Sequence, residues 1–294
     1  MTTRPATVAA LVRQATEQLA ASGVPSPEVD AELLVGHVVG LGRGEVQAAG
    51  LTGRAVTETD AAAIAAFVER RASREPLQHI LGRAAFRSLE LAVGPGVFVP
   101  RPETEQVVQF AIDALRSMPD PEPIGIDLGT GSGAIALAMA TEIPHARIFA
   151  VENSVDAFLW ARQNFTETNA PNATLVFNDL AMAFPELDGQ VAVVISNPPY
   201  VPDAAIPRDP EVRFFDPAAA LYGGEDGLDV VRQLSSTAAR LLRPGGTLVI
   251  EHGELQGAAI RSILTGDGWR AAATFRDLSQ RDRTTTAVRG DNHT

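Results

Sequence analysis

Residues 124–140 read Ile-Gly-Ile-Asp-Leu-Gly-Thr-Gly-Ser-Gly-Ala-Ile-Ala-Leu-Ala-Met-Ala. The first five of these residues predict a buried strand, and the alanine-rich end predicts a helix. Between them, Gly129, Gly131 and Gly133 permit a tight turn and let a ligand approach the backbone at the N-terminus of that helix. The stretch therefore predicts a strand, a ligand-binding glycine loop and a helix.

Strand and helix patterns alternate from residue 102 to residue 288. Strand patterns occur at residues 124–128, 148–151, 174–177, 191–195, 247–250, 271–275 and 284–288, and helical patterns at 102–115, 134–140, 155–165, 228–242 and 258–264. Such alternation predicts an α/β fold with a doubly wound, mostly parallel, Rossmann-like sheet. Ligands of such sheets bind beyond the carboxyl ends of the strands, so side chains that follow a strand are the candidate functional residues.

The first 82 residues carry a different pattern. Apolar residues recur at helical spacing from Val8 to Leu19, and further helices are expected to begin at Pro27 and just after Thr57. This pattern predicts a small helical bundle that contains no cluster of catalytic residue types. The expected organisation is a helical domain over 1–82, a β-hairpin or linker over 83–101 and a catalytic domain over 102–294.

The composition excludes several kinds of chemistry. The chain has 294 residues, 45% of them hydrophobic, which is typical of a globular protein of about two domains. All 24 basic residues are arginine, and there is neither lysine nor cysteine. Schiff-base lysines, thiol nucleophiles, disulfides and Cys-ligated zinc are thereby excluded. The five histidines show no metal-ligand spacing, so no metal is expected.

The charge and hydropathy patterns narrow the partners. The net charge of −12 disfavours stable binding to a nucleic-acid backbone, which normally takes a basic patch. The sequence contains no run of 18 apolar residues, and its N-terminus lacks the continuous apolar segment of a secretion signal. A cytoplasmic protein without a membrane partner is therefore expected.

Acidic side chains stand at or near the ends of three predicted strands. Asp127 precedes the first glycine of the loop by two residues, where a carboxylate suits the ammonium group of S-adenosylmethionine. Glu152 ends the next strand, where a carboxylate accepts both hydroxyl hydrogens of a ribose. Asp179 and Leu180 follow the third, in position for an adenine amino group and ring. Because NAD would suit the glycine loop and Glu152 equally, these residues leave the ligand open.

The motif Asn197-Pro198-Pro199-Tyr200 follows the fourth strand. It resembles the Asn/Asp-Pro-Pro-aromatic motif of methyltransferases that act on planar NH2 groups. Such a nitrogen is a poor nucleophile because its lone pair is delocalised. The side-chain oxygen of Asn197 and the carbonyl of Pro198 can accept its two N–H bonds and favour positive charge on nitrogen in the transition state. Tyr200 supplies a flat wall against the planar group.

Further segments make the resemblance narrower. The chain resembles the peptide-chain release factor N5-glutamine methyltransferases, on residues 75–82, 98–105, 127–133, 197–200, 211–214, 223–228, 251–253, 276–278 and 281–283. The resemblance implies methyl transfer from S-adenosylmethionine to the glutamine of the Gly-Gly-Gln motif in class 1 release factors, with S-adenosylhomocysteine as product. Because the helical domain lacks catalytic features, it is expected to grip the release factor away from the reacting loop.

The resemblance carries a set of site residues with it. Those implied to hold the donor are Asp127, Gly129, Thr130, Gly131, Ser132, Gly133, Glu152, Asp179, Leu180 and Asn197. The catalytic residues implied are Asn197, Pro198 and Tyr200, and those implied to line the substrate cleft are these three with Pro199, Phe98 and Arg101. Two positions depart from the family pattern, since Glu152 stands where aspartate is frequent and Leu180 where an aromatic residue is expected.

Three alternatives share part of this pattern. A ribosomal-protein glutamine methyltransferase would use the same chemistry, and an adenine or cytosine amino-methyltransferase acting on nucleic acid would use the same Asn-Pro-Pro-Tyr motif. An NAD-dependent oxidoreductase would explain the glycine loop but would leave that motif unexplained. The long connection 202–226, which directly follows the motif, is expected to be a lid that contacts the substrate.

Overall fold

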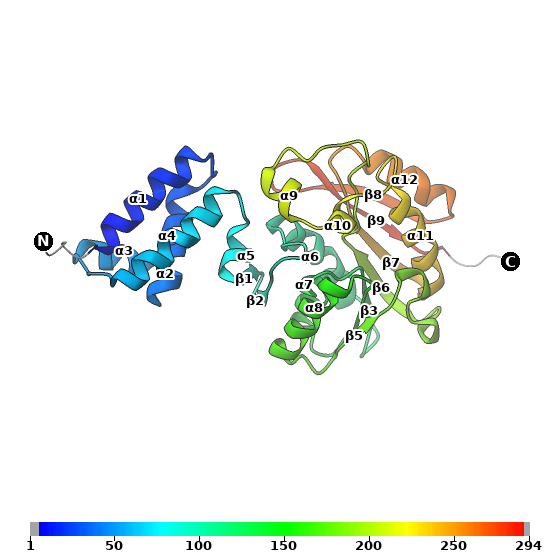
Figure 1. Cartoon of the computed structure of the whole chain (residues 1–294). Helices are drawn as coiled ribbons and strands as arrows, with labels where there is room; N and C mark the ends of the chain where they lie inside the picture. Colours follow the sequence, from blue (N-terminus) through cyan, green and yellow to red (C-terminus); the bar gives the residue numbers. More distant parts are fainter. Residues whose placement is uncertain (1–5, 291–294) are drawn as a thin grey trace, which may run out of the picture. The chain divides into compact units, whose positions relative to one another are not determined.

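The computed structural model describes residues 6–290 (Figure 1). These residues form two compact units. The first comprises the residues up to Gly82 together with Arg208–Phe215, and the second comprises Arg83–Pro207 together with the residues from Asp216 onward. Within the described range, no helix has the length and hydropathy needed to cross a membrane.

The first unit is a helical bundle, as predicted. Its helices are α1 Val8–Ala21, α2 Pro27–Val39, α3 Arg43–Leu51, α4 Glu58–Ala72, α5 Leu77–Leu81 and α9 Pro210–Phe215. The Thr57 hydroxyl accepts from the backbone N–H of Asp60 at 3.1 Å, which confirms the helix start expected there. The apolar faces of α1 to α5 pack into one core around Leu19, Leu34 and Ile64.

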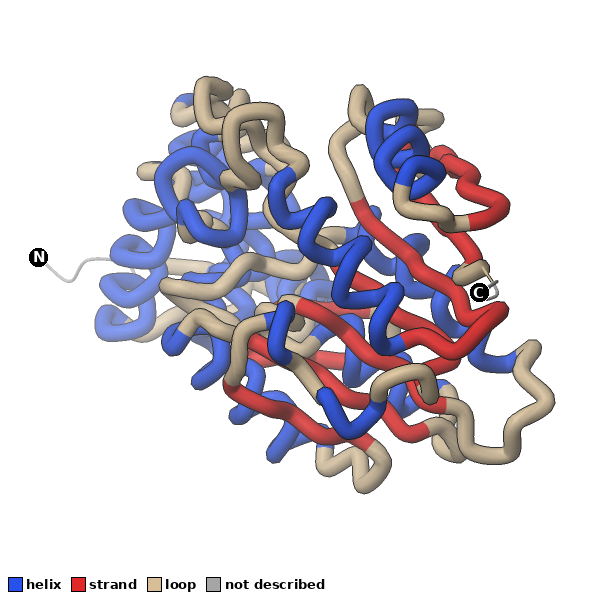
Figure 2. Tube along the Cα trace, turned by 90° about the vertical axis from the view of Figure 1, so that its right-hand side faces the viewer, coloured by secondary structure: helices blue, strands red, loops and turns tan. Residues whose placement is uncertain are grey.

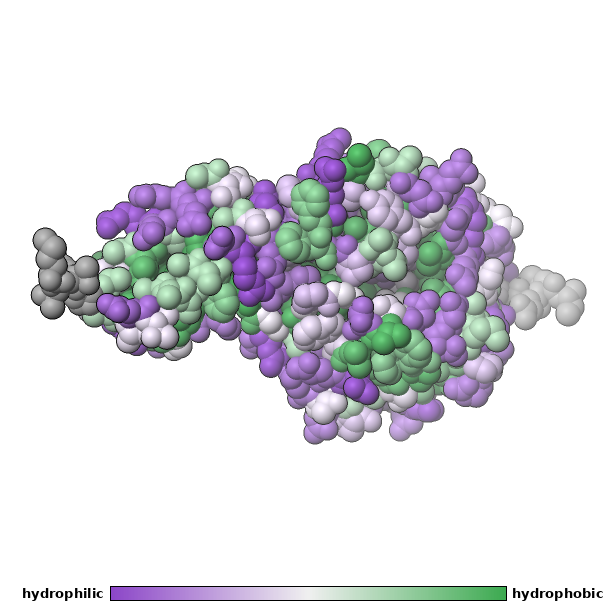
Figure 3. All heavy atoms as spheres, in the orientation of Figure 1, coloured by the Kyte–Doolittle hydropathy of each residue, from purple (hydrophilic) through white to green (hydrophobic). Residues whose placement is uncertain are grey.

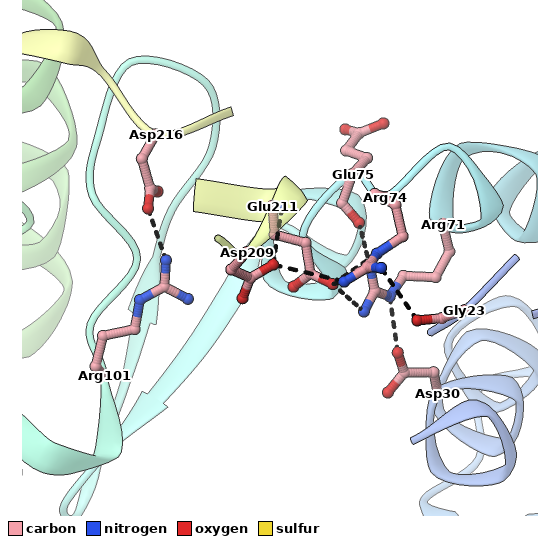
Figure 4. Close-up of polar contacts among 9 residues, drawn as sticks. All are labelled: Gly23, Asp30, Arg71, Arg74, Glu75, Arg101, Asp209, Glu211 and Asp216. Atoms are coloured by element: carbon pink, nitrogen blue, oxygen red, sulfur yellow. Dashed lines mark hydrogen bonds and ion pairs between the residues drawn. The ribbon is translucent and has the colours of Figure 1, made fainter. Parts of the chain in front are cut away.

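Helix α9 belongs to this unit although it lies far along the chain, and ion pairs join its segment to the other helices (Figure 4). The buried Arg71 donates to Asp30 Oδ2 at 2.7 Å and to Glu211 Oε1 at 2.8 Å. Arg74 reaches the same Glu211 oxygen at 3.1 Å. The sequence pattern predicts that residues 208–215 belong to the catalytic domain, whereas the structure groups them with the helical unit, where these ion pairs hold them.

We expect the variant Glu211→Gln to loosen this segment, because it removes a carboxylate from a largely buried arginine pair. Trypsin should then cleave after Arg208 and Arg213 several times faster than in the unchanged protein. Mass spectrometry of timed digests measures the two cleavages. The variant Glu167→Gln, which removes an exposed ion pair with Arg83, is the control. Equal cleavage rates in both variants would show that other contacts hold the segment.

The second unit is built on a seven-stranded sheet, which confirms the predicted fold class. Its strands are β3 Ile124–Leu128, β4 Arg147–Glu152, β5 Ala173–Phe177, β6 Val191–Ser196, β7 Leu242–Glu251, β8 Arg270–Arg276 and β9 Asp282–Val288. They stand in the order β5-β4-β3-β6-β7-β9-β8, with β3 to β7 parallel and β9 antiparallel to both of its neighbours. Figure 2 shows these strands in one twisted layer with helices on either side.

Helices cover both faces of this sheet. The unit contains α6 Pro102–Arg116, α7 Ala134–Glu142, α8 Val155–Thr168, α10 Ala218–Leu221, α11 Asp229–Leu241 and α12 Gly257–Gly266, with short helices η1 Leu180–Met182 and η2 Pro185–Leu187. One core joins α6 and α7 to the sheet, and a second joins α11 and α12 to the other face. The hairpin β1 Arg83–Phe86 and β2 Leu89–Ala92 precedes α6, where short strands were predicted.

Candidate active site

The carboxyl ends of β3 and β6 lie side by side, at the point where the strand order reverses. In doubly wound sheets this is where ligands bind. The glycine loop follows β3 and the Asn-Pro-Pro-Tyr motif follows β6. The Ser196 hydroxyl donates to the carbonyl of Leu128 at 2.6 Å and ties the two strand ends together. The fold therefore brings together the two motifs that the sequence singled out.

The three glycines of the loop serve two purposes. All have positive φ, at 76° for Gly129, 59° for Gly131 and 86° for Gly133, which L side chains rarely adopt. A Cβ atom at Gly133 would lie 2.9 Å from the ring of Phe165, so this glycine also serves packing. At Gly129 and Gly131 a Cβ atom would meet no described atom within 4 Å. The space beside these two glycines is therefore open to a ligand.

Asp127 lies fully buried beneath this loop. Its Oδ2 accepts from the Thr130 hydroxyl at 2.5 Å, while its Oδ1 has no hydrogen-bond partner within the described residues. Burial raises the pKa of Asp127 to about 7. A buried carboxylate oxygen without a partner suits the ammonium group that the sequence analysis assigned to it.

Glu152 clamps the glycine loop to the end of β4. Its Oε2 accepts from the Gly131 N–H at 2.8 Å, and its Oε1 accepts from the N–H groups of Asn153 and Ser154 at 3.0 and 2.8 Å. A carboxylate oxygen has about two acceptor positions. Only Oε2 therefore keeps a free one, which is enough for one ribose hydroxyl rather than the two expected from the sequence. The ribose contact itself remains a prediction.

Asp179 and Leu180 lie at the carboxyl end of β5. Asp179 accepts from the N–H of Ala181 at 2.9 Å and from the side-chain amide of Asn153 at 3.3 Å, which links this end to that of β4. Figure 3 shows an apolar patch over the segments coloured green in Figure 1, which contain α8 and β5. The exposed Phe177 stands three residues before Leu180 and belongs to these segments. This surface suits a flat apolar ring, and contact of Asp179 and Leu180 with adenine remains a prediction.

The Asn-Pro-Pro-Tyr loop is held by backbone packing. A Cβ atom at Gly223 would overlap the carbonyl oxygen of Pro199, and one at Gly227 would overlap that of Tyr200. The side-chain amide of Gln256 donates to the same Tyr200 carbonyl at 2.9 Å. The two glycines therefore let the chain lie directly against the loop, which fixes the direction of its carbonyl groups.

Polar residues that the sequence analysis left without a role surround Asn197. Its Nδ2 lies 3.5 Å from the Thr104 hydroxyl, and the buried Glu251 interacts with both side chains. Burial raises the pKa of Glu251 to about 7, and its Oε2 has no hydrogen-bond partner within the described range. The Tyr200 hydroxyl lies 3.5 Å from Arg283 Nη1, and burial raises the pKa of that tyrosine. Glu251 ends β7, so its position beside β6 is the signal that could have found it.

Phe98 and Arg101 contact each other. The Arg101 guanidinium lies 4.9 Å from the centre of the Phe98 ring. It also donates to Asp216 Oδ2 at 2.7 Å, and that carboxylate is buried (Figure 4). Arg101 therefore fastens the far side of the connection that follows the Asn-Pro-Pro-Tyr loop. Contact of either residue with a substrate remains a prediction.

The structure offers His252 as a hydrogen-bonded residue rather than a proton carrier. Its ring is buried, with Nδ1 2.9 Å from the carbonyl of Gly253 and Nε2 2.8 Å from the Thr285 hydroxyl. Burial lowers the pKa of this histidine, so the neutral ring donates from Nδ1 and accepts at Nε2. Across residues 6–290 no group of three or more His, Asp or Glu side chains could hold a metal ion.

Comparison with known proteins identifies the family. The family model of the PrmC N-terminal domain matches residues 10–82, and that of the methyltransferase small domain matches residues 89–224. A release factor glutamine methyltransferase of Streptomyces coelicolor is 52% identical over 281 residues, which cover 94% of this chain and 96% of the relative. The chain belongs to the release factor glutamine methyltransferase family. This membership confirms the resemblance drawn from the sequence motifs, and the protein is a methyltransferase.

Two further relatives show how widely this methyltransferase fold is used. A 4-amino-L-phenylalanine/4-methylamino-L-phenylalanine methyltransferase of Streptomyces pristinaespiralis is 37% identical and covers 100% of this chain and 98% of its own length. A solved methyltransferase of Pyrococcus furiosus superimposes with a TM-score of 0.51 at 20% identity, over 70% of this chain and 91% of its own. The second relative supports the fold alone.

Proposed function

We propose that this methyltransferase transfers a methyl group from S-adenosylmethionine to the side-chain amide nitrogen of the glutamine in the Gly-Gly-Gln motif of class 1 release factors. The observation that carries the proposal is the packing of the Asn-Pro-Pro-Tyr loop beside the glycine loop, at the reversal of strand order. The 52% sequence identity to a release factor glutamine methyltransferase, over nearly the full chain, supports a release factor as the substrate.

The chain's own residues would orient the amide and exclude other arrangements. The Asn197 side-chain oxygen and the Pro198 carbonyl accept the two N–H bonds of the glutamine amide and direct its nitrogen. The partial negative charges of these two oxygen atoms stabilise the positive charge that develops on the nitrogen as the new bond forms. The Tyr200 ring packs against the flat amide. The new N–CH3 bond replaces the S–CH3 bond, and the nitrogen then loses a proton.

The residues around the glycine loop would hold the donor. When bound, S-adenosylmethionine supplies a methyl group already activated by its positive sulfonium. The free oxygen of Asp127 suits its ammonium group, and the remaining acceptor position of Glu152 suits a ribose hydroxyl. Asp179 and Leu180 suit the adenine. The other donor-binding positions proposed are Gly129, Thr130, Gly131, Ser132, Gly133 and Asn197.

Donor affinity should depend on pH through Asp127. Its carboxylate must be ionised to pair with an ammonium group, and burial raises its pKa to about 7. The dissociation constant should therefore fall about tenfold between about pH 6 and a plateau near pH 8. Calorimetric titration across this range measures the effect. The variant Asp127→Asn should bind weakly at every pH, and an unchanged pH dependence in it would show that another group titrates.

Transfer of a labelled methyl group tests the proposed substrate directly. We expect labelled S-adenosylmethionine to label a purified class 1 release factor and not its variant with the Gly-Gly-Gln glutamine replaced. Equal labelling of both proteins, or of neither, would overturn the proposal. A parallel reaction with ribosomal proteins tests whether the protein is a ribosomal-protein glutamine methyltransferase. A second reaction with duplex DNA tests whether it methylates amino groups of nucleic-acid bases.

An aromatic amine is the second candidate substrate. The relative from Streptomyces pristinaespiralis spans the whole chain, and its named substrates carry an amino group on an aromatic ring. Such a nitrogen also has a delocalised lone pair and would suit the same acceptor groups. Labelling of 4-amino-L-phenylalanine together with an unlabelled release factor would favour this function over the one proposed.

The helical unit is proposed to bind the protein substrate. A groove of about 670 Å³ lies among α1, α2 and α3, with apolar side chains such as Val12 and Val46 and three glutamates in its lining. Leu51 belongs to this lining and is 92% exposed. An apolar groove of this kind is typical of a surface that binds a partner.

The variant Leu51→Ser should lower kcat/KM for whole release factor several-fold, because it removes apolar contact area from the groove. A short peptide that contains Gly-Gly-Gln should be methylated as well as before. Steady-state kinetics with both substrates measure the difference. Leu278→Ser, at a position of the second unit that is as exposed as Leu51, is the matched control. Equal losses for protein and peptide would contradict the assignment of this groove.

A further inference from the structure

Two buried polar residues, Thr104 and Glu251, form hydrogen bonds with each other and with the Asn197 side chain. The Nδ2 of Asn197 is 3.5 Å from Thr104 Oγ1, and the Thr104 hydroxyl and the Asn197 amide both hydrogen-bond to the Glu251 carboxylate. Thr104 and Glu251 are 4% and 2% exposed, so these contacts are shielded from bulk solvent. The three residues come from α6, the end of β6 and the end of β7, which no short sequence pattern connects.

The direction of these hydrogen bonds is set at the carboxylate end. An ionised carboxylate only accepts, so the Thr104 hydroxyl must donate its one hydrogen to Glu251. The lone pairs of the hydroxyl then face Asn197, which must present its NH2 group to them. The opposite atom of the amide, Oδ1, is left for a substrate.

We infer that Glu251 is a positioning residue that acts on Asn197, directly and through Thr104, to keep the side-chain oxygen of Asn197 directed at the substrate amide. The inference rests on the proposed use of Asn197 as an acceptor for a planar NH2 group. If Asn197 turned over, its own NH2 would face the substrate NH2, and two donors would oppose each other. Glu251 would therefore control turnover without touching the substrate.

Protonation of Glu251 would reverse the direction of these hydrogen bonds. A neutral carboxyl group donates, the Thr104 hydroxyl then donates to Asn197, and the amide turns its NH2 outward. Burial, with a smaller contribution from Glu103 on α6, raises the pKa of Glu251 to about 7 against the opposing effects of Arg283 on β9 and of the hydrogen bonds from Thr104 and Asn197. The Tyr200 phenol, which faces this carboxylate, stays neutral because burial raises its pKa. Turnover should consequently rise with pH through about 7 at saturating donor.

The decisive variants are Glu251→Gln, Thr104→Val and Thr104→Ser. At about pH 8 the first two should lower kcat at least about tenfold, while the donor dissociation constant stays within about twofold. Thr104→Ser keeps the hydroxyl and should retain most of the turnover. The pH dependence of kcat should be present in the unchanged protein and absent in Glu251→Gln, because a glutamine does not titrate.

A matched control removes the charge of Glu103, which is close to Glu251 but is not one of the hydrogen-bonded groups that position Asn197. Glu103→Gln should keep kcat at about pH 8 and move the midpoint of the pH profile to lower pH, because Glu103 raises the pKa of Glu251. If Glu251→Gln and Thr104→Val both keep the turnover and pH profile of the unchanged protein, the inference is wrong. If Glu251→Gln does not fold, Thr104→Val against Thr104→Ser still decides.

An NMR measurement on the protein without substrate tests this inference independently of the proposed function. The side-chain amide proton signals of Asn197, followed by NMR, should titrate with a midpoint near pH 7 in the unchanged protein and should not titrate in Glu251→Gln. Absence of that titration in the unchanged protein would overturn the inference even if release factor is methylated. Its presence would support the inference even if release factor is not the substrate.

Discussion

Replacement of Asn197 by alanine will lower kcat for release factor methylation by at least about a hundredfold, the usual cost of losing one preorganised polar contact to a transition state. The side-chain oxygen is one of only two acceptors proposed for the glutamine N–H bonds, and its loss leaves the nitrogen free to rotate. Donor affinity should change by no more than about twofold, because the glycine loop and Asp127 remain.

Single-turnover labelling with saturating donor measures this loss, and calorimetry measures donor binding. Gln163→Ala is a suitable control, because that exposed side chain on α8 donates to Glu167 on the same helix. An Asn197→Ala variant with unchanged kcat would refute the role of the motif. One that loses donor binding as strongly as turnover would instead place Asn197 mainly in the donor site.

The variant Asp127→Asn should raise the dissociation constant of S-adenosylmethionine at least about tenfold, because a hydrogen bond to a charged group contributes about 1.5–3 kcal/mol. The carboxylate is buried, and its Oδ1 has no hydrogen-bond partner within the described residues. Asparagine keeps the shape and can still accept from the Thr130 hydroxyl. Calorimetry measures the change, and Asp113→Asn, at an exposed position on α6, is the control. An unaltered dissociation constant would contradict the assignment.

The same variant should not destabilise the protein without donor. The pKa of Asp127 is raised from 3.8 to about 7 on folding. Between these values the folded state holds a proton that the unfolded state has lost, so the free energy of unfolding falls as pH rises and stays reduced above about 7. At about pH 8 we therefore expect Asp127→Asn to raise Tm while it weakens donor binding. A lower Tm would show that the carboxylate has a structural role.

Asp127 and Glu251 share an unusual property. Each is a buried carboxyl group with one oxygen that has no hydrogen-bond partner within the described residues, and burial raises each pKa to about 7. They stand at the carboxyl ends of β3 and β7, on the two strands that flank β6. Groups of this kind reduce stability, and their position around the reacting centre indicates that function accounts for them.

Local signals in the sequence were enough for the fold class. Apolar runs predicted the five parallel strands of the large sheet, because buried parallel strands need continuous apolar sequence, and shorter strand patterns predicted the antiparallel β8 and β9. The Thr57 cap and the glycines of the loop were read correctly for the same reason, since each depends on residues within one turn of chain. The Asn-Pro-Pro-Tyr motif also stood out, because its chemistry is carried by four consecutive residues.

By itself, then, the sequence determined the sheet, the glycine loop and the motif that faces it, since these depend on short-range patterns. The tertiary structure alone decided that residues 208–215 belong to the helical unit, because the ion pairs of Arg71 with Asp30 and Glu211 join distant segments. It also decided that Glu251 stands behind Asn197. Strand order brings β7 beside β6, and burial then gives an ordinary glutamate a raised pKa and a fixed set of partners. Contacts and burial of this kind arise only when the chain is folded.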